Sequence, residues 1–196
     1  MLKEKLAKYS IILASESPRR KQFFTDLGLD FEVRIKSVEE TYPAHLKGAE
    51  IADYLACLKA TAFHGDLNAN AILITSDTVV WCNGISLAKA AHTAEAVKML
   101  QTLSGQWHEV ITAVCFTTFD AQVVKNHTTH VKFKDLTKAE IDYYVTTYQP
   151  FDKAGAYGIQ EWIGLIGIEE IKGSYTNVVG LPTHLVYNTL LEMTGN

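Results

Sequence analysis

Two hydroxyls and two arginines lie together in residues 15–20, which read Ser-Glu-Ser-Pro-Arg-Arg. The apolar residues 11–14 before them predict a short buried strand, and residues 21–27 after them predict a helix. Ser17 is a natural N-cap, and Pro18 suits the first helical position because no N–H is needed there. Helix N-termini attract anions, and guanidinium groups match phosphate oxygens. The stretch therefore indicates either a phosphate site or simply a capped helix with two solvated arginines.

Four further charged residues stand where chemistry is possible. Asp77 follows the apolar strand predicted at 71–74, as either a turn residue or a catalytic carboxylate at a sheet edge. Lys59 falls within an otherwise apolar helix, where a lysine often only extends its amine to solvent. Lys89 follows a hairpin and can be a solvated loop lysine, and Glu40 is either an ordinary loop acid or a ligand for a hard cation.

Two glycine-containing loops complete the candidate residues. Residues 151–160 contain two glycines, which allow the backbone to approach a ligand closely. Gln160 at the end of this loop carries both a donor and an acceptor, as recognition of a nucleobase edge requires. The second loop, residues 173–182, leads into the last predicted helix and can be purely structural.

The composition limits the class of protein. A chain of 196 residues suits one domain, residues 1–196, and a net charge of −4 argues against a broad nucleic-acid surface. The three cysteines lie in apolar contexts without zinc-ligand spacing, which predicts core thiols in a reducing cytoplasm. The charged N-terminus is unlike a signal peptide, and the apolar runs are too short to span a membrane.

Helices and strands are expected to mix without strict alternation, which predicts an α/β fold with a mixed sheet. His108 is expected to be a buried or capped residue rather than a catalytic one. A two-residue hairpin turn is predicted at Asn83-Gly84, and a longer hairpin turns near Asp120. Helices are predicted at 21–27, 48–64, 93–103, 137–148 and 183–193, and strands at 11–14, 31–35, 71–74, 85–87, 110–119 and 122–133. Residues 75–78 are expected to close the strand at 71–74, and residues 79–81 are expected to be extended again before the hairpin turn.

Taken in order, these segments resemble the Maf family of nucleoside triphosphate pyrophosphatases over nearly the whole chain. The matching motifs are Ser15-x-Ser17-Pro18-Arg19-Arg20, Asp77-Thr78-x-Val80, Asp152-Lys153-Ala154-Gly155-Ala156-Tyr157-Gly158-Ile159-Gln160 and Gly173-Ser174-Tyr175-x-Asn177-Val178-Val179-Gly180-Leu181-Pro182. Weaker matches are Glu40, Lys59-Ala60 and Leu103-Ser104-Gly105-x-x-His108-x-Val110-x-Thr112. One such motif is weak, whereas four long ones in order are specific.

The resemblance implies hydrolysis of a nucleoside triphosphate to the monophosphate and pyrophosphate, in a role that cleans the nucleotide pool. It also implies an elongated mixed sheet flanked by helices, with two lobes, a central cleft and a fold like that of inosine triphosphatases. The resemblance further implies a divalent cation, Mg²⁺ or Mn²⁺, and Mg²⁺ suits these residues because it prefers oxygen ligands. A homodimer is expected by resemblance only, with no nucleic-acid or membrane partner.

Family roles carry over by position. The resemblance makes Asp77 the proton acceptor and makes Arg20, Thr78 and Gln160 the specificity determinants, a set similar to that of the subgroup acting on dTTP and UTP. The remaining polar site positions are matched by Ser15, Glu40, Lys59 and Lys89. Asp77 either activates water or helps Glu40 to hold the metal.

Two positions depart from the family pattern, and one other class of function stays open. Ala90 stands where the family usually has Pro, and Glu161 stands where it often has Gly. The extra carboxylate of Glu161 indicates a change in base preference or in cation binding. The alternative function is a nucleotide-binding regulator of septum formation with little turnover, and pyrophosphate release from dTTP, UTP or modified pyrimidine nucleotides separates the two.

Overall fold

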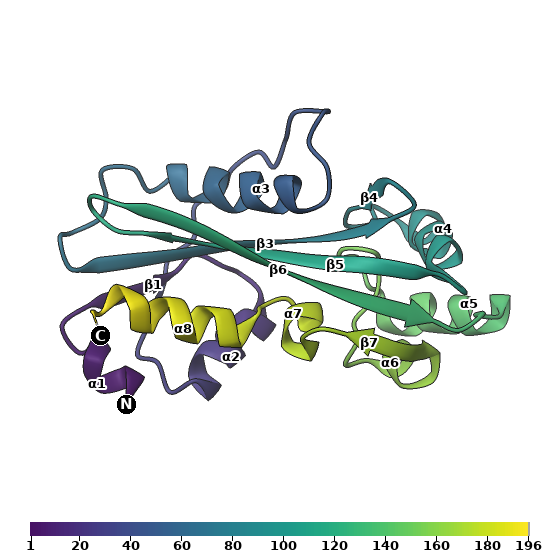
Figure 1. Ribbon diagram of the computed structural model, residues 1–196. Coiled ribbons are helices and arrows are strands. Elements are labelled where there is room, and N and C mark those ends of the chain that lie inside the picture. The colour runs from purple at the N-terminus through teal and green to yellow at the C-terminus, as the bar shows by residue number, and fades with distance from the viewer. Residues whose placement is uncertain (196) are drawn as a thin grey trace. The chain divides into compact units, whose positions relative to one another are not determined.

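The computed structural model describes residues 1–195, and Figure 1 labels their helices and strands. The strands are β1 (Ser10–Leu13), β2 (Glu32–Val33), β3 (Ala71–Cys82), β4 (Ile85–Leu87), β5 (Trp107–Thr117), β6 (Gln122–Phe133) and β7 (Ile168–Lys172). The helices are α1 (Leu2–Leu6), α2 (Pro18–Asp26), α3 (Ala49–Thr61), α4 (Thr93–Leu103), α5 (Lys138–Tyr148), α6 (Trp162–Gly167), α7 (Tyr175–Val179) and α8 (Thr183–Met193).

These strands join one sheet in the order β2-β1-β3-β5-β6-β7, with β4 paired to β3. β1 runs parallel to both β2 and β3, whereas β4 is antiparallel to β3 and β7 is antiparallel to β6. The sheet is therefore mixed, which confirms the predicted α/β class. The hairpin at Asn83 and Gly84 is also confirmed, since both residues have the positive φ, 51° and 80°, that a tight hairpin turn requires.

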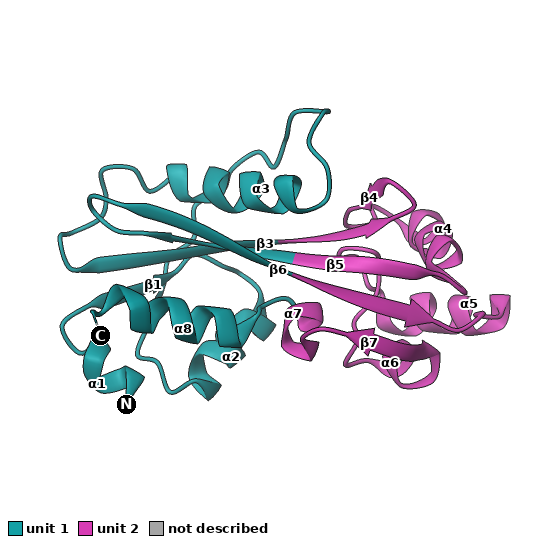
Figure 2. Cartoon of the chain, viewed as in Figure 1, with its two compact units in different colours: residues 1–77, 112–127, 180–196 teal, residues 78–111, 128–179 magenta. Residues whose placement is uncertain are grey.

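The chain divides into two compact units, coloured separately in Figure 2. Unit 1 comprises residues 1–77, 112–127 and 180–196, and unit 2 comprises residues 78–111 and 128–179. Strands β3, β5 and β6 each contribute residues to both units, so the unit boundary falls within strands rather than in a linker. The assignment of 1–196 to a single domain stays a prediction.

Unit 1 has helices on both faces of its strands, and Figure 1 shows α3 on one side and α2 and α8 on the other. Ile11 and Leu13 of β1 and Ile72 and Ile74 of β3 pack in one apolar cluster with residues of α1, α2 and α8. Because side chains alternate along a strand, Thr75 and Asp77 of β3 face α3 instead. This alternation decides which polar side chains of β3 meet which helix.

The prediction that β3 ends near residue 74 is wrong, because the strand continues without a break from Ala71 to Cys82. The polar residues at 75–78 therefore lie in the middle of the strand. Thr75 is fully buried, and its hydroxyl donates a 2.6 Å hydrogen bond to the carbonyl of Ala56 in α3. A polar side chain with a hydrogen-bond partner can remain inside a sheet at little cost, so polarity alone does not mark a strand end.

The strand predicted at 31–35 is reduced to the two-residue β2, and Val33 and Ile35 are 38% and 45% exposed. β2 lies at the edge of the sheet. Alternation of apolar and polar residues indicates an extended chain, but it does not show whether other elements cover the apolar side. The loop predicted at 173–182 contains the helix α7. The elements α1, α6 and β7 span only five or six residues and were not predicted, because short segments show too little periodicity.

The helix predictions are largely correct. The helix expected at 93–103 has the same bounds as α4, and the helix expected at 183–193 has those of α8. Ser17 caps α2 with Pro18 in its first turn. Thr137 and Glu140 form a capping box at the start of α5, as an N-cap threonine followed three residues later by glutamate predicts.

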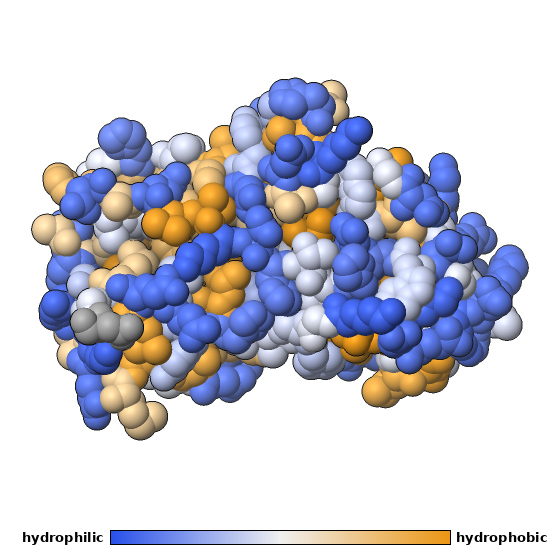
Figure 3. Space-filling view, viewed as in Figure 1, coloured by the Kyte–Doolittle hydropathy of each residue, from blue (hydrophilic) through white to orange (hydrophobic). Residues whose placement is uncertain are grey.

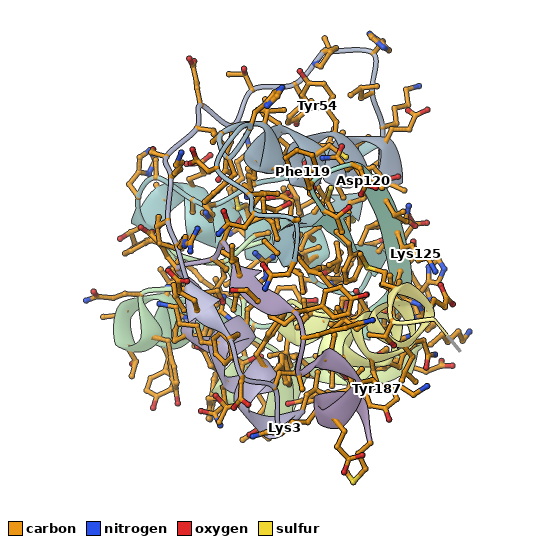
Figure 4. All side chains as sticks on the ribbon, turned by 90° about the vertical axis from the view of Figure 1, so that its left-hand side faces the viewer. Lys3, Tyr54, Phe119, Asp120, Lys125 and Tyr187 are labelled. Carbon is orange, nitrogen blue, oxygen red and sulfur yellow. The ribbon has the colours of Figure 1, made fainter. Side chains whose placement is uncertain are left out.

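The described surface carries apolar side chains in small patches among hydrophilic ones, as Figure 3 shows for one face. The most exposed apolar residues include Leu165 at 80% and Phe119 at 73%. Phe119 and Asp120 lie at the turn between β5 and β6, on the side of unit 1 that faces the viewer in Figure 4. Within residues 1–195, no helix is both long enough and apolar enough to cross a bilayer.

His108 is buried in unit 2, as predicted, with 2% of its surface exposed. Its Nε2 lies 2.7 Å from the hydroxyl oxygen of Tyr157, and its ring stacks on Phe133 at 5.5 Å between centroids. Burial lowers the pKa of His108 from 6.5 to about 4, because an imidazolium in this apolar setting would lose its hydration. The residue is therefore a neutral part of the core.

His108 makes the stability of the protein depend on pH. Below pH 6.5 the unfolded chain binds a proton on His108 that the folded protein does not bind until about pH 4, so stability falls as the pH drops through this window. The difference between the two pKa values of His108 corresponds to about 3 kcal/mol of unfolding free energy. His108→Gln should remove the dependence of stability on pH that His108 causes in this window. Urea denaturation between pH 4 and 7 measures it. The matched change His64→Gln, at an exposed histidine, should leave the slope as it is.

Candidate active site

An ion-pair cluster in unit 1 joins three of the predicted site residues. The Nζ atom of Lys59 lies 2.6 Å from Oδ1 of Asp77 and 3.1 Å from Oε1 of Glu40. Lys59 comes from α3 and Asp77 from an odd-numbered position of β3, so strand alternation turns the carboxylate toward α3. One ammonium group thus contacts two carboxylates that are far apart in the sequence.

The cluster is shielded from water to different degrees. Asp77 is 8% exposed, the Lys59 side chain is 18% exposed and the Glu40 side chain is 43% exposed. Burial raises the pKa of Asp77, while the charges of Lys59 and Arg20 oppose that rise. Lys59 therefore does not simply extend its amine into solvent, because the ammonium group lies between the carboxylates of Asp77 and Glu40.

Arg20 of α2 makes contacts that sequence reasoning missed. Its Nε donates a 2.9 Å hydrogen bond to the carbonyl of Gly180, and its Nη1 donates a 2.9 Å bond to the carbonyl of Ser76. Burial lowers the pKa of Arg20, and the nearby charge of Asp77 opposes this shift. The guanidinium thus joins α2 to the residue before Asp77 and to the segment that leads into α8.

The hydroxyls of the turn before α2 serve as caps in this structure. Ser15 is 7% exposed, and its Oγ accepts a 3.2 Å hydrogen bond from the backbone N–H of Ser17. The Oγ of Ser17 accepts from the N–H of Arg20 at 3.4 Å. The N-cap interpretation of the turn is confirmed, and the binding of phosphate by Ser15 stays a prediction.

The other three predicted residues, Thr78, Lys89 and Gln160, belong to unit 2. Thr78 follows Asp77 in β3 and is half-buried, whereas Lys89 and Gln160 are exposed. Lys89 pairs as an antiparallel bridge with Ala154 of the glycine-containing loop. Lys89 and that loop are therefore held side by side within unit 2.

The glycine at 155 has a packing reason that differs from the one expected. Gly155 has a φ of 67°, and a Cβ there would lie 2.9 Å from Cγ1 of Val80. Its N–H donates to the carbonyls of Leu87 and Ala88 at 2.8 and 3.2 Å. The close approach is therefore to β3 and to the segment before Lys89, so this glycine by itself does not indicate a ligand.

Sequence reasoning did not single out a second ion-pair cluster, which lies in unit 2. Lys153, which is 9% exposed, has its Nζ 2.7 Å from Oδ1 of Asp152 and 3.0 Å from Oε1 of Glu161. The hydroxyl of Tyr144 donates to the other carboxylate oxygen of Glu161. The available signals were the lysine within an otherwise apolar motif and the departure of Glu161 from the family pattern.

The predicted metal ligands were tested against this geometry. Among residues 1–195, no group of three or more His, Cys, Asp or Glu side chains is arranged to hold a metal ion. Glu40 and Asp77 nevertheless share one cation, the ammonium of Lys59. Mg²⁺ is commonly held by one or two carboxylates together with waters and substrate phosphates, so this pair of acids fits such an ion.

Comparison with known proteins gives one consistent result. The family described as Maf-like protein matches residues 10–193. A dTTP/UTP pyrophosphatase of Christiangramia forsetii is 57% identical over 193 residues, which cover 98% of each chain. Another, of Flavobacterium johnsoniae, is 56% identical over 193 residues, which cover 98% of this chain and 100% of the relative. The solved Staphylococcus aureus Ham1 protein has a TM-score of 0.53 at 20% identity and covers 94% of this chain and 99% of its own, a likeness of fold alone.

The two carbonyl contacts of Arg20 predict that lysine cannot replace it. Lysine lacks the planar fork that reaches two acceptors at once, so Arg20→Lys should leave one carbonyl unpaired and lower the free energy of unfolding by about 2 kcal/mol. Urea denaturation measures the change. Arg34→Lys is the matched control, because Arg34 pairs with the exposed Glu32 and its replacement should shift the midpoint little. Equal effects of the two changes would contradict a bridging role for Arg20.

Proposed function

The chain belongs to the Maf-like protein family, and on this premise we propose that it hydrolyses dTTP and UTP to the monophosphate and pyrophosphate. The names of its relatives, dTTP/UTP pyrophosphatase, support this activity at 56–57% identity over nearly the full length. The single observation in the structure that carries the proposal is the buried carboxylate of Asp77 paired with Lys59. A role in removing unwanted nucleotides from the pool follows from the same reaction.

Asp77 is proposed as the group that accepts a proton from the attacking water. Burial raises the pKa of its carboxyl, which makes the carboxylate a better proton acceptor. In the free protein Lys59 occupies this carboxylate. A triphosphate competes for the same ammonium, so its binding would draw Lys59 toward the phosphates and leave Asp77 available to water.

The bond changes balance without a further reactant. The water oxygen bonds to a phosphorus of the α–β anhydride, and one proton of the water passes to Asp77. The bridging P–O bond breaks and leaves its electrons on the departing group, which is pyrophosphate after attack on the α-phosphorus and the nucleoside monophosphate after attack on the β-phosphorus. Lys59 and Arg20 provide positive charge in unit 1, with Ser15 near the start of α2. Lys89 is proposed as a further cation for the phosphate chain.

The proposed reaction includes a divalent cation, Mg²⁺ or Mn²⁺. Glu40 and Asp77 are the residues that would hold it, because they already share one positive charge. Such an ion supplies charge that offsets the charge of the phosphates. The two proposed roles of Asp77, proton acceptor and metal ligand, use the same carboxylate. Titration of an Asp77 variant with the metal ion distinguishes the two roles.

Gln160 and Thr78 are proposed to select the base, together with Arg20. The amide of Gln160 offers an acceptor and a donor, which match the N3–H and the carbonyl shared by thymine and uracil. Gln160 is exposed in unit 2, so its amide is accessible to a ligand. Thymine and uracil differ by one methyl group, worth only about 1 kcal/mol, so little discrimination between them is expected.

A cytoplasmic location and a homodimer remain proposals. The three cysteines are free thiols, with Cys82 and Cys115 buried and Cys57 half-buried, which suits a reducing compartment. A regulator of septum formation with little turnover was the alternative function. Release of pyrophosphate from dTTP or UTP at a catalytic rate would exclude that alternative.

Asp77→Asn should lower kcat for dTTP by about 10²–10⁴-fold while nucleotide binding persists, because the amide keeps the shape but cannot accept the proton. Pyrophosphate release measures turnover, and isothermal calorimetry measures binding. Asp66→Asn is the matched control, since Asp66 makes an exposed ion pair with Lys36. A kcat close to that of the unaltered protein would show that Asp77 is neither the base nor an essential ligand.

The base preference gives a second test. The kcat/KM values for dTTP and UTP should exceed those for CTP, ATP and GTP by at least about 10²-fold, because a mismatched base leaves polar groups unpaired. Gln160→Ala should reduce this ratio, and Gln22→Ala, at an exposed residue of α2, should not. A purine preference, or a ranking that Gln160→Ala leaves unaltered, would contradict the proposed base recognition.

A further inference from the structure

The exposed Gln160 lies in a turn between two residues that both contact one side chain, Gly158 through its backbone N–H and Glu161 through its carboxylate. The N–H of Gly158 donates a 3.0 Å hydrogen bond to the hydroxyl oxygen of Tyr144, and the same hydroxyl donates to the carboxylate of Glu161. The backbone N–H of Glu161 donates back to the carbonyl of Gly158 at 3.0 Å, which closes the turn. A single residue of α5 thus fixes the two positions that flank Ile159 and Gln160.

The carboxylate of Glu161 is itself fixed. Lys153 lies 3.0 Å from its Oε1, and the side chains of Lys153 and Glu161 are only 10% and 20% exposed. Burial, with the carboxylate of Glu161, raises the pKa of Tyr144, so the hydroxyl stays protonated as a donor. The carboxylate of Glu161 is therefore held in one place beside the turn.

The ends of the Gln160 and Glu161 side chains both lie close to the Cα of Gly158. A Cβ atom at Gly158 would lie 3.0 Å from Nε2 of Gln160, 2.9 Å from Cδ of Glu161 and 3.1 Å from Oε2 of Glu161. The NH₂ end of the Gln160 amide and the carboxylate thus approach the same point. A carboxylate attracts an amide NH₂ group and repels an amide oxygen, so this neighbourhood favours one of the two orientations of the amide.

We propose that Glu161, held by Tyr144 and Lys153, is a positioning residue that fixes the flip state of the Gln160 amide and so excludes cytosine. The proposal rests on the proposed role of Gln160 in base recognition. With the NH₂ group turned toward Glu161, the amide oxygen points away from the carboxylate and can accept the N3–H of uracil or thymine. Cytosine has no hydrogen on N3 and carries an amino group beside it.

A rotation of the amide by half a turn would reverse the preference. The NH₂ group would then donate to N3 of cytosine, and the oxygen would accept from the amino group of that base. A freely rotating glutamine therefore discriminates poorly between these bases, and the fixed charge of Glu161 removes this ambiguity. The departure of this chain from the family pattern at Glu161 acquires a specific chemical role.

The decisive variant is Glu161→Gln, which keeps the shape but removes the charge. The ratio of kcat/KM for UTP to that for CTP should fall about tenfold, mainly through a higher KM for UTP and a lower KM for CTP. In a Gln160→Ala background the same change should have no effect on the ratio. Glu170→Gln, in an exposed pair with Lys172 of the same unit, is the charge-matched control.

Gly158→Ala provides a second variant if the loss of charge weakens the fold. Its methyl group would meet the ends of the Gln160 and Glu161 side chains rather than backbone, so the chain should still fold. It should lower the same ratio because it separates the amide from the carboxylate. Tyr148→Phe, on the ring that stacks on Tyr144, is its control and should leave the ratio unaltered.

A measurement without turnover separates this proposal from the proposed function. The side-chain NH₂ resonances of Gln160, assigned by their loss in Gln160→Ala, should be well dispersed in the free protein and should collapse toward random-coil positions in Glu161→Gln. Resonances that already have random-coil positions in the unaltered protein would overturn the positioning role. An unchanged UTP:CTP ratio in Glu161→Gln would overturn it as well, whereas an unaltered protein without pyrophosphate release would overturn only the proposed function.

Discussion

A buried carboxylate needs a compensating charge, and the pairing of Asp77 with Lys59 meets this constraint in unit 1. Asp77 lies inside a twelve-residue strand, so its charge cannot be solvated by moving into a loop. Helix α3 must therefore present a cation at that height of the strand. The same ammonium also contacts Glu40, so the segment around Glu40, which has no regular secondary structure, is held next to Lys59. The position of α3, the path of the loop and the properties of the carboxylate all depend on this one pair.

Two helices, α3 and α2, contribute positively charged groups around Asp77. Asp77 meets α3 on one face, while the carbonyl of the preceding residue, Ser76, accepts from Arg20 of α2. Arg20 also reaches the carbonyl of Gly180, where the chain turns toward α8. The arginine thus holds the backbone beside the acid, and its charge also acts on the acid. Its charge is available near Asp77 while its geometry stabilises the strand.

Unit 2 uses the same chemistry for a different purpose. Lys153 and Glu161 form an ion pair with little exposure, and Tyr144 links that pair to the backbone of the turn before Gln160. In unit 1 the ion pair involves the carboxylate that is proposed as the proton acceptor. In unit 2 the ion pair lies beside a turn that ends in an exposed amide. Partly buried ion pairs therefore occur in both units, next to the residues proposed for catalysis in one and for base recognition in the other.

The sequence by itself determined the local features of this protein. The caps at Ser17 and Thr137, the hairpin at Asn83 and the bounds of α4 follow from hydrogen bonding and φ preferences within a few residues. Motifs in order along the chain also determined the family, now shown by the match over residues 10–193.

Only the tertiary structure decided how polar residues are paired. Thr75 within β3 pairs with the carbonyl of Ala56 in α3, Lys59 contacts Asp77 18 positions away, and Glu161 contacts Tyr144 17 positions away. Sequence patterns report the polarity and period of a segment. Whether a buried charge or hydroxyl finds a partner is set by long-range packing, which no local pattern contains.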